Sequence, residues 1–435
     1  MLWPLVVEQF LTYSITGADI LMVSSLGEYA VSAVNIIENI NYLLVIAFTA
    51  MCTGGAVVVA QYIGRQDHNN SRLAAKQLVY SVILISLFVT VFTLLLRRPM
   101  IRFIFGNIED DVFNASTIYL FFISLSYPFF ALNSANAALF RAMGNSRVPM
   151  LIGVLANVIN ISFNAIFIYS LGMGVMGAAL ATLLCRIAAA AVSTFLLYRN
   201  KSSPVSLEGL FRIRIVISII KSILNVGLPS AIESSMFMFG RLMTQRIFTY
   251  FGTAVMAANA VSTLVNSITF MPGMAVGLAM LTIVGQCIGA GDYEEAKKQV
   301  KKLMWMAYIT LTVISLLTLV LIRPLTSLFN LGPEAQESAL IFIRVHCFAL
   351  AVFWASSFCI PNALRAAGDV RYVMICAVIS MWTVRVLLAY VLAFTFGIGP
   401  VAVWLAMGAD FFLRGVLFVH RWKGGKWQNK RVIEE

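Results

Sequence analysis

The sequence contains few charged residues and very few acidic ones. Only 11% of its 435 residues are charged, with 19 acidic against 31 basic side chains, whereas 60% are hydrophobic. A soluble domain of this length needs more charge on its surface, so the composition excludes that class and indicates a protein with many membrane spans. The apolar runs are unbroken over roughly 20 residues, which also argues against a transmembrane β-barrel, whose strands alternate over about ten.

Histidine and cysteine are scarce and scattered. Of three histidines, only His346 lies in an apolar segment, and no second ligand stands near it at metal-binding spacing. The six cysteines also lack such spacing, so we expect small buried side chains instead of disulfides or metal ligands. A membrane-embedded enzyme needs a cluster of His, Asp or Glu, so we expect no enzyme and no cofactor.

Sequence motifs typical of several other kinds of membrane or targeted protein are missing. No loop has Walker spacing, so ATP-driven transport lacks support. No segment has periodic arginines and no loop resembles a selectivity filter, which disfavours a voltage sensor or a channel. The first apolar segment is long and contains acids, unlike a cleavable signal peptide. The net charge of +12 does not require nucleic acid as a partner, because Lys and Arg cluster in short loops on one side of the predicted helices.

The apolar runs predict an all-α membrane protein with twelve transmembrane helices. The expected helices cover residues 3–25, 30–63, 73–96, 114–138, 149–170, 175–197, 229–250, 254–288, 303–322, 336–360, 373–395 and 401–420.

Alternate loops carry most of the basic residues. They lie at 65–72, 140–147, 198–214, 291–302, 364–371 and 420–435. By the positive-inside rule we expect these loops and both termini in the cytoplasm, and the chain in a bacterial inner membrane. Arg97, Arg98 and Arg102 lie on the opposite side and depart from the rule.

An internal repeat organises the chain. At a shift of 225 residues, identical residues coincide across six predicted helices, including Pro4 with Pro229, Glu8 with Glu233, Gly27 with Gly252, Asn41 with Asn266, and Asp67 with Asp292. Because six is even, both halves cross the membrane in the same sense, and a pseudo-two-fold axis along the membrane normal relates two six-helix lobes. We therefore expect an N-terminal lobe at 1–197, a cytoplasmic linker with a short amphipathic segment at 198–228, a C-terminal lobe at 229–422 and a basic tail at 423–435.

The first segment contains two acids, Glu8 and Asp19. Eleven residues at about 100° each return to nearly the same helix face, so both can point to one interior surface. A charged carboxylate inside a membrane costs roughly 3 kcal/mol or more and usually has a function. For Asp19 we favour a cation site over a structural contact between helices, and for Glu8 both interpretations stay open.

Paired motifs at helix ends resemble those of the MATE (multidrug and toxic compound extrusion) family. They are AQYIGRQD and VGQCIGAGD after the second and eighth segments, FRAMGNSRVPM and LRAAGDVRYVM after the fourth and tenth, and GMGVMGAALAT at the start of the sixth. The resemblance covers the whole chain. It implies export of organic cations and other amphipathic compounds, driven by inward flow of Na⁺ or H⁺.

The resemblance also implies a coupling site in the N-terminal lobe. Asp19 stands at the position of the family's first-helix acid, Asn160 and Thr182 match its fifth-helix Asn and sixth-helix Thr, and Asn164 stands where the family often has Asp. Asp19 would then bind Na⁺ if sodium is the coupling ion, or carry a proton. Hydrogen bonding between helices is an equally good explanation of the asparagine pair.

The second lobe lacks this acid cluster. Thr244 and Arg385 occupy the positions of Asp19 and Asn160 after the shift. We expect a substrate cavity that includes Glu8, Glu233, Met236 and Met243, with the methionines forming a deformable wall. Glu38 and Asp410 are further buried candidates. We also expect some of the arginines in or near apolar segments to neutralise Glu233 and Asp410.

These features predict an antiporter that exports amphipathic, often cationic, compounds in exchange for Na⁺ or H⁺. Its partners are small organic substrates and the lipid bilayer, and we expect a monomer. The alternative is a lipid-linked oligosaccharide flippase of the same superfamily. The arginines in or near the apolar segments are compatible with this alternative.

Overall fold

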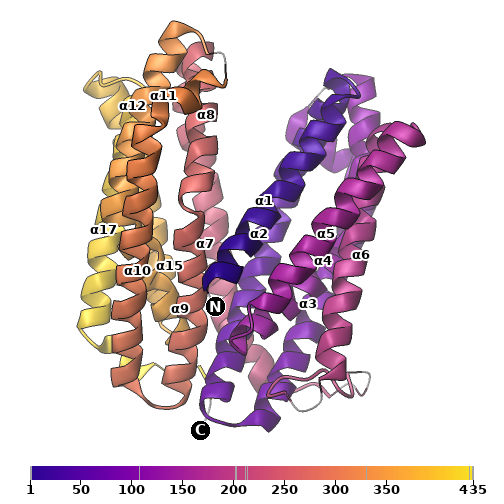
Figure 1. Ribbon diagram of the computed structural model, residues 1–435, viewed down its shortest axis with the longest axis vertical. Helices are drawn as coiled ribbons and strands as arrows, with labels where there is room; N and C mark the ends of the chain where they lie inside the picture. Colours follow the sequence, from indigo (N-terminus) through magenta and orange to yellow (C-terminus); the bar gives the residue numbers. More distant parts are fainter. Residues whose placement is uncertain are drawn as a thin grey trace. The chain divides into compact units, whose positions relative to one another are not determined.

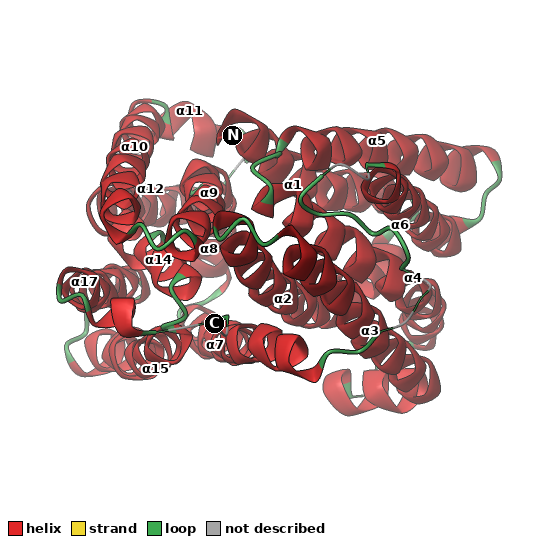
Figure 2. Ribbon diagram, turned by 90° about the horizontal axis from the view of Figure 1, so that it is seen from below, coloured by secondary structure: helices red, strands yellow, loops and turns green. Residues whose placement is uncertain are grey.

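The structure is a computed structural model that describes residues 2–106, 108–200, 203–210, 212, 214–329, 331–430 and 432–433. Over these residues the regular secondary structure is entirely helical (Figures 1 and 2). The chain divides into two compact units, unit 1 at Trp3–Leu228 and unit 2 at Pro229–Glu435.

Unit 1 is a bundle built around α4 (Asp110–Ala142). This helix packs on α2 (Glu28–Gly64), α3 (His68–Phe105) and α6 (Gly174–Arg199), and Figure 2 shows it between α3 and α6. The remaining helices are α1 (Leu2–Ser24) and α5 (Arg147–Asn164), which continues as the π-helical turn η1 (Ala165–Ser170).

Unit 2 has more interruptions in its helices. After α7 (Ile217–Tyr250) come α8 (Thr253–Thr269), α9 (Met271–Gly289), α10 (Tyr293–Val320) and α11 (Ile322–Ser327). The next span contains α12 (Pro333–Ala349), the π-helical η2 (Leu350–Trp354), α13 (Ala355–Phe358) and α14 (Ile360–Ala366). The last two contain α15 (Val370–Ser380), η3 (Met381–Leu387), α16 (Leu388–Tyr390) and η4 (Val391–Thr395), then α17 (Val401–Lys423) and the 3₁₀ turn η5 (Lys426–Asn429).

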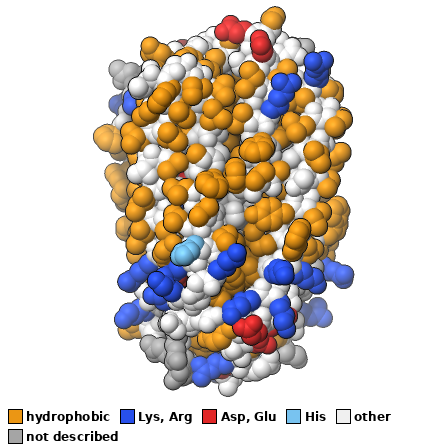
Figure 3. Space-filling view, turned by 90° about the vertical axis from the view of Figure 1, so that its left-hand side faces the viewer, with side chains coloured by type: hydrophobic (Ala, Val, Ile, Leu, Met, Phe, Trp, Pro, Cys, Tyr) orange, Lys and Arg blue, Asp and Glu red, His pale blue; other side chains and the backbone are white. Residues whose placement is uncertain are grey.

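When helices that continue one another count as one span, the described residues form twelve spans, as predicted. Ten of them combine the length and apolar composition needed to cross a membrane. The other two are α1 and α7, which contain Glu8, Asp19 and Glu233. On the face in Figure 3, hydrophobic side chains cover the middle, and most Lys and Arg side chains gather toward one end. This distribution is typical of a membrane protein.

The prediction of one helix over 254–288 is wrong in one respect. The helix breaks at Phe270, between α8 and α9. Pro272 accounts for the break, because it has no N–H to donate to the preceding turn and lies in the first turn of α9, where this N–H is not needed.

The stretch 198–228 also differs from the prediction. Between Arg199, where α6 ends, and Ile217, where α7 begins, the described residues form no helix, so the expected amphipathic segment is not seen as a helix there. Side chains of α3 hold this stretch: Gln77 Nε2 donates to the Arg214 carbonyl at 2.6 Å, and the Tyr80 hydroxyl donates to the Leu210 carbonyl at 2.5 Å. Tertiary hydrogen bonds therefore fix a segment whose sequence pattern alone indicates a surface linker.

The repeat is visible in local geometry. Asp67 and Asp292 cap α3 and α10, and their carboxylates accept hydrogen bonds from the amides of Asn70 at 3.0 Å and Glu295 at 2.8 Å. Gly144 and Gly368 follow the α4 and α14 helix ends with φ of +80° and +87°, a conformation that favours glycine. Equivalent turns therefore end equivalent helices in the two units.

The start of α7 packs closely on α2 within unit 1. A Cβ atom added at Gly54 would lie 2.5 Å from the Ile223 carbonyl oxygen and 2.8 Å from the Gly227 nitrogen. Only a residue without a side chain allows this approach of the two backbones.

We expect Gly54→Ala to destabilise the protein by about 1–3 kcal/mol, because the added methyl group overlaps backbone atoms that cannot rotate away. Thermal unfolding of the purified protein in detergent measures this as a lower midpoint. Gly17→Ala is the matched control, since a Cβ there meets no atom within 4 Å. Equal midpoints for the two variants would contradict the close packing of α2 on α7.

Candidate functional site

The four residues expected to bind the coupling cation lie together inside unit 1. Asp19 comes from α1, Asn160 and Asn164 from the last turns of α5, and Thr182 from α6. All are at most 7% exposed. Residues separated by more than 140 positions thus form one polar cluster within apolar helices.

Neutral donors hold the Asp19 carboxylate. Asn164 Nδ2 donates to Asp19 Oδ1 at 2.5 Å, and the Thr182 hydroxyl donates to Asp19 Oδ2 at 3.4 Å. The same Asn164 nitrogen donates to Asn160 Oδ1 at 3.2 Å. Over the residues that the structure describes, no lysine or arginine forms an ion pair with Asp19.

One acceptor in this cluster has no partner. Asn164 Oδ1 is buried and accepts no hydrogen bond from the described part of the chain. A carboxylate with amide and hydroxyl oxygens nearby is a suitable ligand set for a hard cation such as Na⁺. If the coupling ion is a proton, it would bind the Asp19 carboxylate within the same cluster.

The π-helical turn after Asn164 belongs to the fold and is not specific to this site. In unit 1, η1 covers Ala165–Ser170, and in unit 2, η4 covers Val391–Thr395, close to the same place after the repeat shift. The residue that corresponds to Asn164 is Ala389, which cannot bind a cation. The turn is thus shared, whereas the aspartate and the two asparagines are not repeated at the equivalent positions of unit 2.

Asp19 lines a cavity of about 360 Å³ that lies entirely within unit 1. Its wall includes other polar residues from five helices: Glu8, Glu38, Asn41, Tyr119, Asn133, Asn157, Thr182 and Arg186. Apolar and aromatic side chains form most of the remaining wall, among them Tyr13, Tyr42 and Phe130. Small-molecule sites have this combination of apolar walls and a few polar groups.

Glu8 lies at the same cavity as Asp19, as the helix periodicity predicts. Its carboxylate accepts a hydrogen bond from Arg141 on α4, with Oε1 and NH1 2.5 Å apart, and both side chains are mostly buried. Glu8 therefore has a cationic partner within the protein, whereas Asp19 has none among the described residues.

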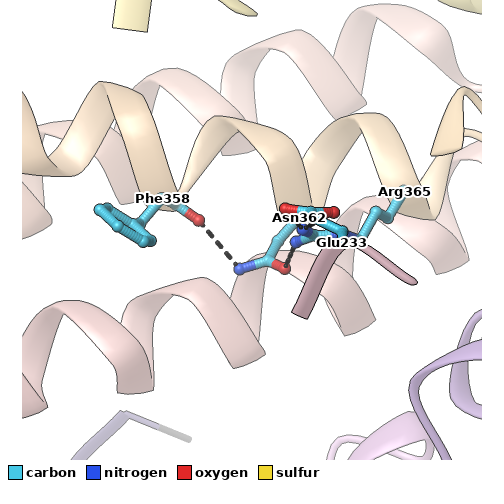
Figure 4. Close-up of polar contacts among 4 residues, drawn as sticks. All are labelled: Glu233, Phe358, Asn362 and Arg365. Atoms are coloured by element: carbon cyan, nitrogen blue, oxygen red, sulfur yellow. Dashed lines mark hydrogen bonds and ion pairs between the residues drawn. The ribbon is translucent and has the colours of Figure 1, made fainter. Parts of the chain in front are cut away.

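The other expected cavity residues belong to unit 2. Glu233, Met236 and Met243 are on α7, outside the unit 1 cavity. Glu233 accepts two hydrogen bonds from Arg365 NH2, at 2.7 and 2.8 Å, and Asn362 Oδ1 accepts one from Arg365 NH1 at 2.8 Å (Figure 4). The Asn362 amide group donates in turn to the Phe358 carbonyl.

Arg365 is not recognisable as a partner from its sequence context, because it lies in the expected basic loop at 364–371. In the structure Arg365 lies in the last turn of α14. The internal repeat indicates this partner. At a shift of 225 residues Glu8 coincides with Glu233, and at a shift of 224 residues Arg141 coincides with Arg365. Both units therefore join the first helix of the repeat to the fourth by the same ion pair.

The prediction that interior arginines neutralise Asp410 is confirmed. Arg414 NH2 lies 3.0 Å and Arg385 NH1 3.7 Å from Asp410 Oδ2, and the Ser380 hydroxyl donates to Asp410 Oδ1 at 2.6 Å. Phenylalanine rings pack on both guanidinium groups. His346 is also in unit 2, where its Nε2 lies 3.0 Å from the Thr269 hydroxyl and its ring packs on Trp404.

Two repeated units of membrane-spanning helices, with a polar cavity inside unit 1, define a membrane transporter built by duplication. The MatE family model matches the chain twice, at residues 4–166 and 229–391, so this protein belongs to the MatE family. The two matches start 225 residues apart, in agreement with the repeat. The protein is therefore an integral membrane transporter and not an enzyme.

Relatives cover nearly the whole chain. It is 27% identical to "Probable multidrug resistance protein NorM" of Thermotoga maritima, over 94% of this chain and 88% of the relative. It is 25% identical to "Uncharacterized transporter YisQ" of Bacillus subtilis, over 98% and 94%. A solved structure described as "Crystal structure of MATE in the bent conformation" is similar at a TM-score of 0.90 and 18% identity, over 97% of this chain and 93% of that one.

We expect the Glu233–Arg365 pair to contribute about 2 kcal/mol to stability, between the values for exposed and fully buried pairs. A double-mutant cycle with Glu233→Gln and Arg365→Met, followed by thermal unfolding, measures the coupling energy. The Glu294–Lys297 pair is the control, because it has the same 2.7 Å separation but exposed side chains. Coupling no larger than in this control would contradict a structural role for the buried pair.

Proposed function

We propose that the protein is a secondary active antiporter that exports amphipathic, often cationic, organic compounds in exchange for Na⁺ or H⁺. The observation that carries the proposal is the Asp19 carboxylate, buried at a cavity inside unit 1 and held only by neutral donors. A membrane-embedded acid without a fixed counter-charge is suited to exchange a cation with the solution. The multidrug resistance relatives in the same family support export of organic compounds.

Coupling follows from thermodynamic linkage. If cation binding at Asp19, Asn164 and Thr182 draws α1, α5 and α6 together, the cavity between these helices changes shape. A compound that prefers the other shape then binds more weakly, and by reciprocity its binding weakens that of the cation. Inward flow of the cation thus drives outward release of the compound.

The charge of the cavity favours organic cations over the anionic headgroup of a lipid-linked oligosaccharide. Three acids line it, Glu8, Asp19 and Glu38, and Arg186 is the only basic residue on its described wall. Two of the interior arginines that favour the flippase alternative, Arg385 and Arg414, lie beside Asp410 in unit 2 and outside this cavity. We further propose that the protein acts as a monomer in a bacterial inner membrane with both termini in the cytoplasm, in line with its basic loops.

We expect Asp19→Asn to abolish ion-driven efflux, because asparagine preserves the shape of the side chain but cannot carry a proton or contribute a negative charge to Na⁺ binding. Ethidium efflux from proteoliposomes with an imposed Na⁺ gradient, and separately with an imposed H⁺ gradient, measures the effect and identifies the coupling ion. Glu28→Gln, at an exposed acid outside the cavity, is the control for lost charge. Efflux by Asp19→Asn at the wild-type rate would refute the assignment.

A further inference from the structure

We propose that Glu38 is the residue of the unit 1 cavity that binds the positive charge of the transported compound and so selects cations. The proposal rests on the proposed transport function and deepens it. Glu38 lies on α2 and lines the cavity together with Asp19.

Neutral hydrogen bonds hold the Glu38 carboxylate in place. The Tyr119 hydroxyl donates to Oε1 at 3.2 Å, and Asn41 Nδ2 donates to Oε2 at 3.0 Å. Both donors are buried, with Tyr119 1% and Asn41 5% exposed. Over the described residues no lysine or arginine pairs with Glu38, so the fold orients its charge without neutralising it.

The charges around the cavity leave Glu38 available to a ligand. Glu8 is paired with Arg141. Arg186 donates from NH1 to the Ser126 hydroxyl at 2.7 Å, and its guanidinium lies 5.0 Å from the centre of the Phe130 ring. By formal charge, Glu8 and Arg141 cancel, and Asp19, Glu38 and Arg186, the only basic residue on the described wall, leave one excess negative charge when no cation is bound at Asp19. A monovalent cation neutralises it.

A second observation at the same place indicates a ligand. Asn41 lines the cavity wall, and its buried Oδ1 has no hydrogen-bond partner in the described part of the chain. An unpaired acceptor beside a carboxylate without a basic partner favours a positively charged or donor-bearing molecule.

The cavity also has the size and the walls for an aromatic cation. Its volume of about 360 Å³ is within the range of small-molecule sites, and Tyr13, Tyr42 and Phe130 contribute aromatic surface. Aromatic faces attract cations, and a nearby carboxylate adds a directional charge. Asp19 is less accessible than Glu38, because Asp19 is 7% exposed whereas the Glu38 side chain is only partly buried.

Glu38 is not a structural element of the repeat. Its counterpart after the shift of 225 is Thr263, whereas the neighbouring Asn41 is matched by Asn266. A carboxylate required by the fold would be expected in both units, as Glu8 and Glu233 are. The presence of Glu38 in unit 1 alone agrees with a role in its cavity.

Equilibrium binding to the purified protein in detergent tests the proposal. The probes are tetraphenylphosphonium, a monovalent aromatic cation, and triphenylphosphine oxide, a neutral molecule with similar rings. We expect the wild type to prefer the cation, and Glu38→Gln to weaken cation binding by about tenfold or more while the oxide changes little. Glu38→Asp, which restores the charge, should recover part of the affinity, and Glu28→Gln should behave as the wild type.

Three outcomes would overturn the proposal. They are a wild type without preference for the cation, unchanged cation binding in Glu38→Gln, and equal losses for both probes, which would indicate a structural role. Efflux from proteoliposomes separates this proposal from the proposed function. Charge-selective binding without gradient-driven efflux would refute antiport alone, whereas gradient-driven efflux with unaltered charge preference in Glu38→Gln would refute the role of Glu38 alone.

Discussion

The cost of an ionised group inside a membrane constrains this structure more than any other interaction. Each acid in the apolar helices needs either a basic partner or polar neighbours. Glu8 has Arg141, Glu233 has Arg365, and Asp410 has Arg414 and Arg385. Asp19 and Glu38 are the exceptions among the described acids of the unit 1 cavity, because their carboxylates accept hydrogen bonds from neutral side chains and form no ion pair with a described basic residue.

The two units accommodate their buried acids partly in the same way and partly in different ways. The ion pair between the first and fourth helices of the repeat is present in both units, as are the aspartate caps at Asp67 and Asp292. The cluster around Asp19 has no counterpart, and unit 2 instead has Asp410 among arginines. Duplication therefore preserved the bonds that hold helices together, while the polar interiors diverged.

Part of the fold and of the site was predictable from local patterns. Twelve spans, their approximate limits and the repeat follow from hydropathy and identity at a constant shift, and Asp19 stands out as an acid in an apolar run. The break at Phe270 was missed, although Pro272 offered a signal. The extension of α7 to Ile217 was also missed, because it depends on close packing against Gly54 of α2, which hydropathy does not report.

The sequence by itself determined the class of the protein, since the free energy of membrane insertion is a sum over neighbouring residues and can be read along the chain. Only the tertiary structure decided which charges meet. Arg365 and Glu233 are 132 positions apart, and Asn164 and Asp19 are 145 apart. It also decided that Glu38 shares the cavity of Asp19 without a basic partner, because such contacts depend on how helices pack side by side and not on the order of residues within one helix.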